Sequence, residues 1–196
     1  MIVGVLALQG AVREHMQMIA RVGATPLAVK TRDELKKTDA LILPGGESTT
    51  IGKLMTEFNL KDEIIRRAKE GMPVWGTCAG MILLAKHIVN QENTHLDLMD
   101  IWVRRNAYGS QLDSFIAEKR VEGVSEKPIP MVFIRAPYVE KVGPGVKILS
   151  EIDGKVVAAR EGNLLATAFH PELTEDLSFH KYFLRIIEDK SSACEA

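Results

Sequence analysis

The run Trp75-Gly76-Thr77-Cys78-Ala79-Gly80 places a cysteine between an apolar strand pattern and an apolar helix pattern. A sharp strand-to-helix turn brings backbone close to backbone, so a nucleophile at its apex requires small residues two positions before and after it. Gly76 and Gly80 meet this requirement. The spacing therefore indicates a nucleophilic thiol and an enzyme that transfers acyl groups. A buried structural cysteine is the alternative, and for a lone cysteine it is the more common case.

A histidine and a carboxylate in the run His170-Pro171-Glu172 could complete such a site. The run directly follows an apolar segment with the composition of a strand. Residues two apart in an extended chain point to the same side, and Pro171 disfavours helical backbone at His170, so His170 and Glu172 can share one face. A nearby imidazole favours the nucleophilic thiolate, and a carboxylate would orient the imidazole. We expect these two residues to act with Cys78; a surface histidine before a turn is the alternative.

A glycine-rich loop, Leu43-Pro44-Gly45-Gly46-Glu47-Ser48-Thr49-Thr50, lies between a buried strand pattern and a helix pattern. Attack on a carbonyl builds negative charge on its oxygen, and loss of one preorganised donor costs roughly 10²–10³ in rate. The backbone N–H of Ala79 is one candidate donor, and the two glycines would allow N–H groups of this loop to turn toward a ligand. The loop lacks the Gly-Lys-[Ser/Thr] ending of a P-loop. An ordinary structural turn is the alternative.

Composition limits the possible classes of protein. The chain has 196 residues, of which 46% are hydrophobic and 26% charged, as is typical of one globular domain spanning 1–196. A net charge of −1 without a long Lys/Arg cluster argues against nucleic-acid binding. Apolar stretches are shorter than the ~18 residues of a membrane span. Two cysteines and an N-terminal segment without a basic leader pattern predict a cytoplasmic protein with reduced thiols.

Strand and helix patterns alternate in the first half of the chain. Strands are expected at 2–8, 26–29, 40–43 and 73–76, and helices at 12–22, 49–56, 61–69 and from 79 onward. The second half is richer in strands, at 101–103, 115–121, 131–134, 146–149, 156–159 and 164–169, and ends in a helix at 179–187. We expect a doubly wound, mostly parallel α/β sheet with helices on both faces and some antiparallel strands in the second half. Ligands of such sheets bind beyond the carboxyl ends of the strands, where Cys78 and His170 would lie.

The remaining histidines and the second cysteine do not match this pattern. His15 and His87 fall within helical patterns, His95 lies in a polar loop, and His180 lies at the start of the last helix. None of them follows a strand pattern and has a carboxylate two residues later. Cys194 lies in a polar tail that we expect to be frayed.

Taken together, these motifs resemble those of the class I glutamine amidotransferases, whose glutaminase domains pair a G-x-C-x-G elbow with a later H-x-E. The resemblance is closer to the family of glutaminase subunits of pyridoxal 5′-phosphate synthase, and it covers nearly the whole chain. The segments that carry it are Gly4 to His15 (GVLALQGAVREH), Leu43 to Thr50 (LPGGESTT), Gly76 to Gly80 (GTCAG), Arg105 to Gly109 (RNAYG), Phe133 to Pro137 (FIRAP) and Phe169 to Asp176 (FHPELTED).

The resemblance implies a function and a set of site residues. The chain would hydrolyse L-glutamine to glutamate and ammonia, without a metal or cofactor, and hand the ammonia to a (β/α)₈-barrel synthase subunit. Cys78 would form a glutamyl thioester, and His170, supported by Glu172, would transfer the protons. The residues implied in glutamine binding are Gly46, Glu47, Ser48, Arg105, Ile134 and Arg135. Those implied at or near the oxyanion are Ala79, Gly46, Gln9 and Gly10.

One position departs from the family pattern, and two other functions stay open. Ser110 stands where we expect a basic residue after Arg-Asn-x-aromatic-Gly, which puts in doubt any surface contact made through that position. One alternative is a γ-glutamyl hydrolase, or a glutaminase of another synthase, on the same fold. The other is a catalytically silent regulatory subunit. The Pro-Gly-Gly-Glu-Ser-Thr-Thr and Arg-Ala-Pro segments argue against the first, and the intact Cys, His and Glu argue against the second.

Overall fold

The structure is a computed structural model that describes residues 1–105 and 114–194, with side chains as far as residue 190. Its strands are β1 (Ile2–Leu6), β2 (Thr25–Val29), β3 (Ala40–Leu43), β4 (Val74–Thr77), β5 (Ala85–Ile88), β6 (Met99–Arg104), β7 (Ser114–Val121), β8 (Ser125–Ile134), β9 (Tyr138–Val142), β10 (Lys147–Ile152), β11 (Lys155–Glu161) and β12 (Leu164–Thr167). Its helices are α1 (Val12–Arg21), α2 (Arg32–Lys36), α3 (Ser48–Glu57), α4 (Lys61–Lys69), α5 (Ala79–Leu84), α6 (Ser178–Cys194) and the 3₁₀ turn η1 (Pro171–Leu173).

Ten of the described strands form one large sheet, and β7 pairs with β8 in a separate hairpin. The order in the large sheet is β2-β1-β3-β4-β12-β11-β9-β6-β5, with β10 paired to β11. The pairs from β2 to β12 are parallel. Strand β11 is antiparallel to β12, and β9 is antiparallel to β6. The predicted fold class, a mostly parallel sheet with antiparallel strands in the second half, is confirmed.

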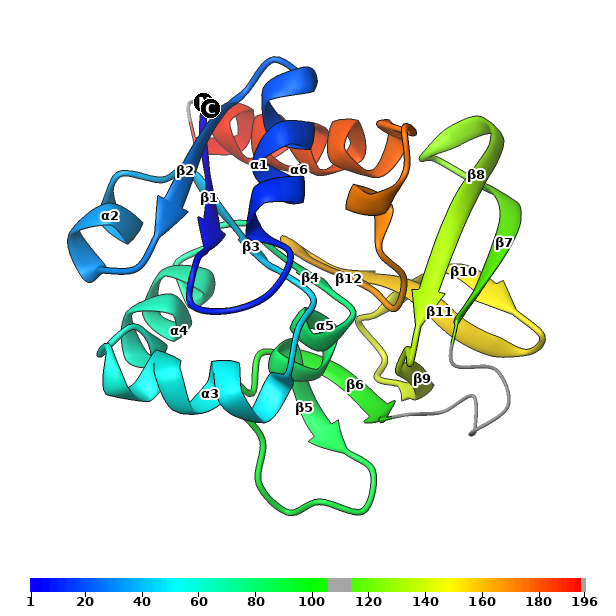
Figure 1. Ribbon diagram of the computed structural model, residues 1–196, viewed down its shortest axis with the longest axis horizontal. Helices are drawn as coiled ribbons and strands as arrows, with labels where there is room; N and C mark the ends of the chain where they lie inside the picture. Colours follow the sequence, from blue (N-terminus) through cyan, green and yellow to red (C-terminus); the bar gives the residue numbers. More distant parts are fainter. Residues whose placement is uncertain (106–113, 195–196) are drawn as a thin grey trace.

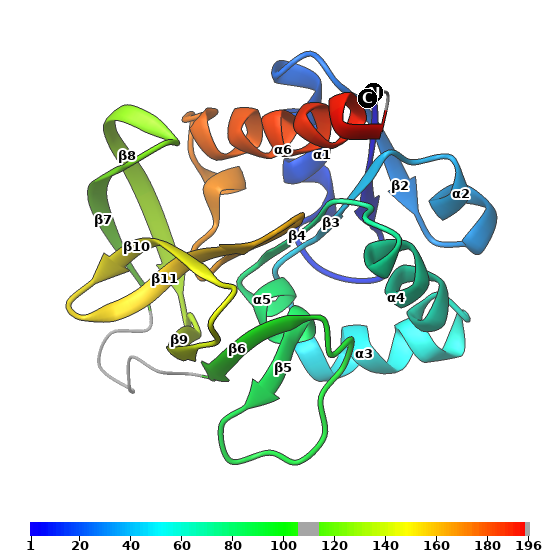
Figure 2. The same ribbon diagram turned by 180° about the vertical axis from the view of Figure 1, so that it is seen from behind.

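Helices cover both faces of this sheet. Figures 1 and 2 show α1 and α6 side by side on one face, and α3, α4 and α5 on the other. Successive side chains of β4 point to opposite faces of the sheet, so this strand contacts helices on both faces. Trp75 faces α6, where its ring centroid lies 6.4 Å from that of Phe179 and 5.5 Å from that of Phe183. Gly76 faces α5, where a Cβ atom would come within 2.3 Å of the backbone of Gly80.

The central strands are buried along their whole length. Every residue of β3, β4 and β12 is buried, as parallel strands covered by helices on both faces should be. Their apolar side chains belong to one continuous hydrophobic core. The assignment of residues 1–196 to a single domain stays a prediction. Within the described part of the chain, no helix is both long and apolar enough to span a membrane.

The structure also corrects several expected elements. Sequence patterns missed β9 and α2, although α2 has a capping box in which Thr31 and Glu34 exchange hydrogen bonds. The apolar segment after Cys78 divides: α5 ends at Leu84 and β5 begins at Ala85, so His87 lies on a strand rather than a helix. Helix α6 continues beyond its expected end to Cys194. The expectation that the tail around Cys194 is frayed stays a prediction.

Candidate active site

The candidate site lies where neighbouring parallel strands end. Strands β1, β3, β4 and β12 are adjacent in the sheet, and Gln9, Gly46, Cys78 and His170 lie in the segments that follow them. Because the carboxyl ends of parallel strands meet at one edge of a sheet, these segments converge there. All these residues line one cavity of about 380 Å³.

Cys78 occupies a strained turn between β4 and α5. Its backbone has φ 50° and ψ −104°, a conformation that residues with a Cβ rarely adopt and that costs on the order of 1–3 kcal/mol. Its N–H donates to the carbonyl of Thr167 on β12 at 2.8 Å. A Cβ on Gly80 would come within 2.0 Å of the Leu43 carbonyl oxygen, so only glycine allows α5 to pack this close to β3. The turn thus holds the thiol at the wall of the cavity.

His170 and Glu172 form a short contact beside this turn. His170 Nδ1 lies 2.7 Å from Glu172 Oε1, and both side chains are almost fully buried. The His170 N–H donates to the Val132 carbonyl on β8 at 2.8 Å, which fixes the backbone at this position. A Cβ on Gly45 would come within 2.3 Å of His170 Cε1, so the glycine loop can lie against the ring only because it has no side chain there.

The electrostatics of the pair favour an imidazolium beside a carboxylate. Burial lowers the pKa of His170, but its hydrogen bonds with Cys78 and with Glu172 outweigh burial and raise the pKa to about 10. Burial raises the pKa of Glu172, whereas the adjacent His15 and His170 lower it, and the result lies below the ordinary value. A cation next to the sulfur favours the thiolate, which is the form that attacks a carbonyl carbon.

The residues predicted to bind glutamine all lie on the wall of the same cavity, namely Gly46, Glu47, Ser48, Arg105, Ile134 and Arg135. Ser48 Oγ is buried and has no hydrogen-bond partner within residues 1–105 and 114–190. Buried polar atoms are normally paired, so this hydroxyl is a group that a bound ligand could satisfy. Arg135 has a positive φ of 42°, so a second strained residue lies on this wall.

Glu47 and Arg105 place a negative and a positive group close together on the cavity wall. The Glu47 carboxylate accepts hydrogen bonds from the Thr50 hydroxyl at 2.7 Å and from the N–H groups of Thr50 and Thr49 at the start of α3. These bonds lower the pKa of Glu47 to about 2. Arg105 Nη2 lies 3.4 Å from Glu47 Oε1. An anion and a cation side by side suit a ligand that carries both an ammonium and a carboxylate group.

Three of the four residues predicted at or near the oxyanion line the cavity: Ala79, Gly46 and Gln9. The side-chain oxygen of Gln9 accepts the Glu47 N–H at 2.8 Å. Gly10 does not line the cavity; it has φ 105°, and a Cβ there would come within 1.8 Å of the Gly45 carbonyl oxygen. The turn after β1, which contains Gly10, therefore packs against the backbone of the glycine loop.

Some site residues were missed by the sequence analysis, and some lie outside the described residues. Ile82 and Pro137 line the cavity. Ile82 lies one helical turn after Cys78, a spacing that could have identified it. Of the matched segment that begins at Arg105, positions 106–109 are outside the described residues, as is Ser110. Within the described ranges, no group of three His, Cys, Asp or Glu side chains could hold a metal ion.

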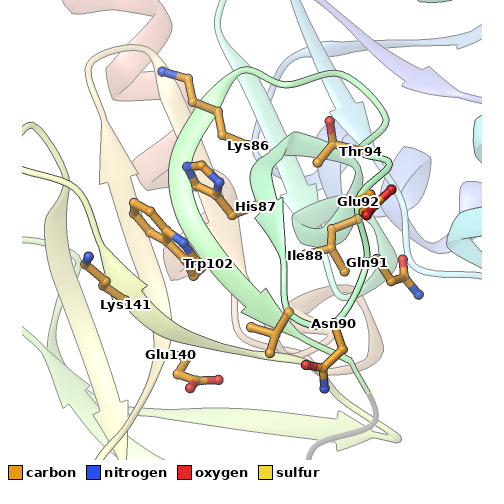
Figure 3. Close-up of a pocket in the computed structure, with 11 residues that line it drawn as sticks. Lys86, His87, Ile88, Asn90, Gln91, Glu92, Thr94, Trp102, Glu140 and Lys141 are labelled. Carbon is orange, nitrogen blue, oxygen red and sulfur yellow. The ribbon is translucent and has the colours of Figure 1, made fainter.

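A second cavity, of about 460 Å³, lies at the edge of the sheet beside β5 and β6 (Figure 3). The His87 ring stacks on Trp102 with centroids 3.9 Å apart, and Lys141 Nζ lies 4.6 Å from the centre of the same indole. His87 Nε2 is 3.7 Å from Asp100 Oδ1. The described lining of this cavity includes no cysteine. It is larger than the first cavity but lacks a thiol paired with a buried histidine and carboxylate, so the chemistry favours the first.

Comparisons with known proteins agree with this geometry. A curated relative from Caldanaerobacter subterraneus subsp. tengcongensis, named "Pyridoxal 5'-phosphate synthase subunit PdxT", is 58% identical over 185 residues, which is 94% of this chain and 98% of that protein. A relative of the same name from Clostridium botulinum is 52% identical over 190 residues, covering 96% of this chain and 98% of that protein.

Solved structures and a family model extend these similarities. A structure described as "Crystal structure of glutamine amidotransferase" has a TM-score of 0.90 and 46% identity, covering 95% of this chain and 98% of that chain. PurLQS from Thermotoga maritima, at 17% identity and a TM-score of 0.64 over 96% of this chain and 97% of that chain, shares the fold. The model of the SNO glutamine amidotransferase family matches residues 5–189. The chain therefore belongs to the SNO glutamine amidotransferase family.

Proposed function

We propose that this chain is the glutaminase subunit of a pyridoxal 5′-phosphate synthase. It hydrolyses L-glutamine to L-glutamate and ammonia, and it passes the ammonia to a (β/α)₈-barrel synthase subunit. The observation that carries the proposal is the arrangement of Cys78 and His170 at one cavity, with the buried Glu172 behind His170 and its Oε1 2.7 Å from His170 Nδ1. The names of the curated relatives support the same assignment.

Acylation of Cys78 is the first half of the reaction. The thiolate attacks the carboxamide carbon of glutamine, a C–S bond forms, and negative charge develops on the carboxamide oxygen. In this proposal, the backbone N–H groups of Ala79 and Gly46, two residues that line the cavity, stabilise that charge. His170 then donates its proton to the departing nitrogen, the C–N bond breaks, and ammonia leaves a γ-glutamyl thioester on Cys78.

Hydrolysis of the thioester is the second half. The neutral His170 removes a proton from water as the oxygen attacks the thioester carbon. The C–S bond breaks, glutamate leaves, and the thiolate and imidazolium are restored. Glu172 stays ionised throughout and keeps His170 in the tautomer that presents Nε2 to the reacting atoms, because its Oε1 accepts the Nδ1–H.

The cavity offers complementary groups for the amino-acid end of glutamine. Arg105 and Arg135 supply positive charge for the α-carboxylate, and Glu47 supplies negative charge for the α-ammonium group. Ser48 Oγ, buried and unpaired within the described residues, is available to the substrate. A γ-glutamyl peptide has the same amino-acid end, so recognition there does not separate glutamine from such peptides.

The release of ammonia gives a chemical reason for a partner. Ammonia that escapes into water is largely protonated at neutral pH and is then no longer nucleophilic, so hydrolysis should be coupled to the enzyme that consumes ammonia. We place the reaction in the cytoplasm, because an attacking Cys78 requires a compartment that keeps thiols reduced.

Glutamate release measured with and without a purified barrel subunit tests this function. We expect weak glutaminase activity from the chain alone and a marked rise when the barrel subunit is added. Equal rates in both conditions would count against the coupling. Faster cleavage of γ-glutamyl peptides than of glutamine would favour a γ-glutamyl hydrolase, and no turnover in either condition would favour a silent regulatory subunit.

A further inference from the structure

Two buried histidines lie behind the triad, on the side away from the cavity. His15 Nε2, from α1, is 3.4 Å from Glu172 Oε2 and 3.1 Å from the Thr77 hydroxyl oxygen. His15 Nδ1 is 3.2 Å from Nε2 of His180, from α6. A continuous line of polar groups thus runs from the sulfur through His170 and Glu172 to the two imidazoles.

This line is enclosed by apolar groups. His15 has no exposed surface and His180 has 2%. The indole of Trp75 packs edge-on against both imidazole rings, with centroid distances of 5.8 Å and 4.9 Å. Burial lowers the pKa of His15 and lowers that of His180 well below its ordinary value. Both rings are therefore neutral at physiological pH, and each has one nitrogen that donates and one that accepts.

The contacts determine which nitrogen donates. Glu172 is ionised, so a lone pair on His15 Nε2 would face a carboxylate oxygen; Nε2 therefore carries the hydrogen. Its hydrogen-bond partner is the Thr77 hydroxyl oxygen, whereas Glu172 Oε2, at 3.4 Å, is in ion-pair contact and has no hydrogen-bond partner within the described residues. His15 Nδ1 is then an acceptor, and it requires the hydrogen of His180 Nε2. This leaves His180 Nδ1 as a bare acceptor, and it is a buried atom without a partner within the described residues. The opposite tautomer would leave a buried N–H unpaired there, which is the costlier arrangement.

We propose that His15 is a positioning residue of the triad: its Nε2–H edge, 3.4 Å from Glu172 Oε2, attracts that oxygen electrostatically, so that Oε1 stays on His170 Nδ1; the proposal rests on the function proposed above for this cavity. The carboxylate is thereby fixed from both ends, by His170 through one oxygen and by His15 through the other. His180 fixes the tautomer of His15 in turn.

The contact between His15 and Glu172 matters most after the first proton transfer of the reaction. When His170 has protonated the departing nitrogen, it is neutral, and the buried Glu172 carboxylate loses the nearest positive charge. A donor that does not titrate during the cycle keeps the carboxylate ionised and oriented until His170 is protonated again. The groups that face His15 are Glu172 and His170 after β12, Glu14 on its own helix and His180 on α6. Arg21 is the remaining charge that acts on His180.

Two substitutions of similar length separate positioning from packing. In His15→Gln, the side-chain amide can place an N–H close to the position of Nε2–H, whereas His15→Met fills the space without a donor. We expect His15→Met to lower kcat for glutamine hydrolysis by on the order of tenfold to a hundredfold with KM nearly unchanged. His15→Gln should recover most of this loss. If the role is packing alone, the apolar Met should be tolerated at least as well as Gln.

A second readout does not depend on glutamine turnover. In ¹⁵N-histidine NMR, with His170 assigned through the His170→Gln variant, we expect His15→Met to lower the titration midpoint of His170 by about one unit. His15→Gln should leave that midpoint near the wild-type value. An unchanged midpoint in His15→Met, or equal behaviour of the two variants, would overturn the proposal. Absence of glutaminase activity in the wild-type protein would contradict the proposed function, and the NMR result would still decide the role of His15.

His180 provides the same test at one step farther from the triad. If His15→Met does not fold, as judged by circular dichroism, the pair His180→Gln and His180→Met replaces it. We expect His180→Met to shift the His170 midpoint downward, by less than His15→Met would, and His180→Gln to restore it. Equal midpoints in these two variants would equally overturn the proposal.

Discussion

Of the three pairs of a histidine and a carboxylate among the described residues, two have a histidine that lines a cavity, and these two differ in nearly every physical respect. In His170–Glu172 the atoms are 2.7 Å apart and the side chains are 10% and 0% exposed. In His87–Asp100 they are 3.7 Å apart and 44% and 25% exposed. The first pair lies at the carboxyl ends of central parallel strands, and the second lies at the sheet edge, where His87 stacks on Trp102.

Residue types alone do not make a catalytic pair. Burial removes the water that would otherwise weaken the charge interaction between the two groups, so the carboxylate can act on the imidazole. A sulfur atom on the other side of His170 then gives the imidazole a reacting partner. The ring of His87 stacks on the indole of Trp102 instead. Cavity size alone would select the His87–Asp100 pair, because the cavity at the sheet edge is the larger of the two.

Removal of the nucleophile should have the largest effect. We expect Cys78→Ala to lower kcat for glutamine hydrolysis by at least about 10⁴-fold, because loss of the nucleophile removes the covalent route. The thermal unfolding midpoint should change little. Initial rates of glutamate release, followed alongside circular dichroism, measure both quantities. Retention of more than a small fraction of wild-type turnover would show that the thiol is not the attacking group.

Conversion of the buried carboxylate to an amide comes second. Glu172→Gln should lower kcat by on the order of 10²–10⁴-fold, because the imidazole loses the charge that orients and stabilises it. The pKa of His170 is raised to about 10 by its partners, so the protonated form persists until the pH approaches that value. Loss of the carboxylate lowers this pKa, and the alkaline limb of the pH–rate profile should move to lower pH. An alkaline limb at the wild-type position would contradict the proposed role of Glu172.

Sequence patterns predicted the parts of the fold that depend on local periodicity and composition. The run Ala40–Leu43 is a strand because four apolar residues in succession suit a strand buried on both faces. The glycines around Cys78 indicated the strained turn, and the H-x-E spacing indicated the His170 pair. By contrast, β5 could not be separated from the apolar residues of α5, because its strand conformation depends on pairing with β6.

The support behind the triad could not be predicted, because it depends on distant segments. His15 lies on the apolar stripe of α1, and a polar residue in such a stripe is a signal of a buried, hydrogen-bonded group. Its partners, however, are Thr77, Glu172 and His180, which only the packing of α1 and α6 on the same face brings together. The support that His15 and His180 give to Glu172 therefore depends on tertiary structure rather than on sequence motifs.

A smaller effect is expected at Ser48, whose buried hydroxyl is unpaired within the described residues. Ser48→Ala should raise KM for glutamine by about three- to tenfold, because the substrate loses one hydrogen bond. The free energy of unfolding should stay the same or rise, since an unpaired buried group is removed. Ser150 on β10 is the matched control, because its hydroxyl is also buried and unpaired but does not line the cavity. If Ser150→Ala raised KM as much as Ser48→Ala, the contact with substrate would be disproved.

The smallest effect is expected from the same chemical change, carboxylate to amide, at the second pair. Asp100→Asn should leave kcat/KM for glutamine within about twofold of wild type and the free energy of unfolding within about 0.5 kcal/mol, because exposed ion pairs contribute little. The backbone of Asp100 also holds its strand: its N–H donates to the Glu161 carboxylate, and its carbonyl accepts from the Gly143 N–H. The amide variant keeps both bonds. Parallel assays of Asp100→Asn and Glu172→Gln therefore compare one substitution in two surroundings. A loss of activity in Asp100→Asn close to that in Glu172→Gln would show that the sheet-edge cavity takes part in the reaction, and that burial is not what distinguishes the two pairs.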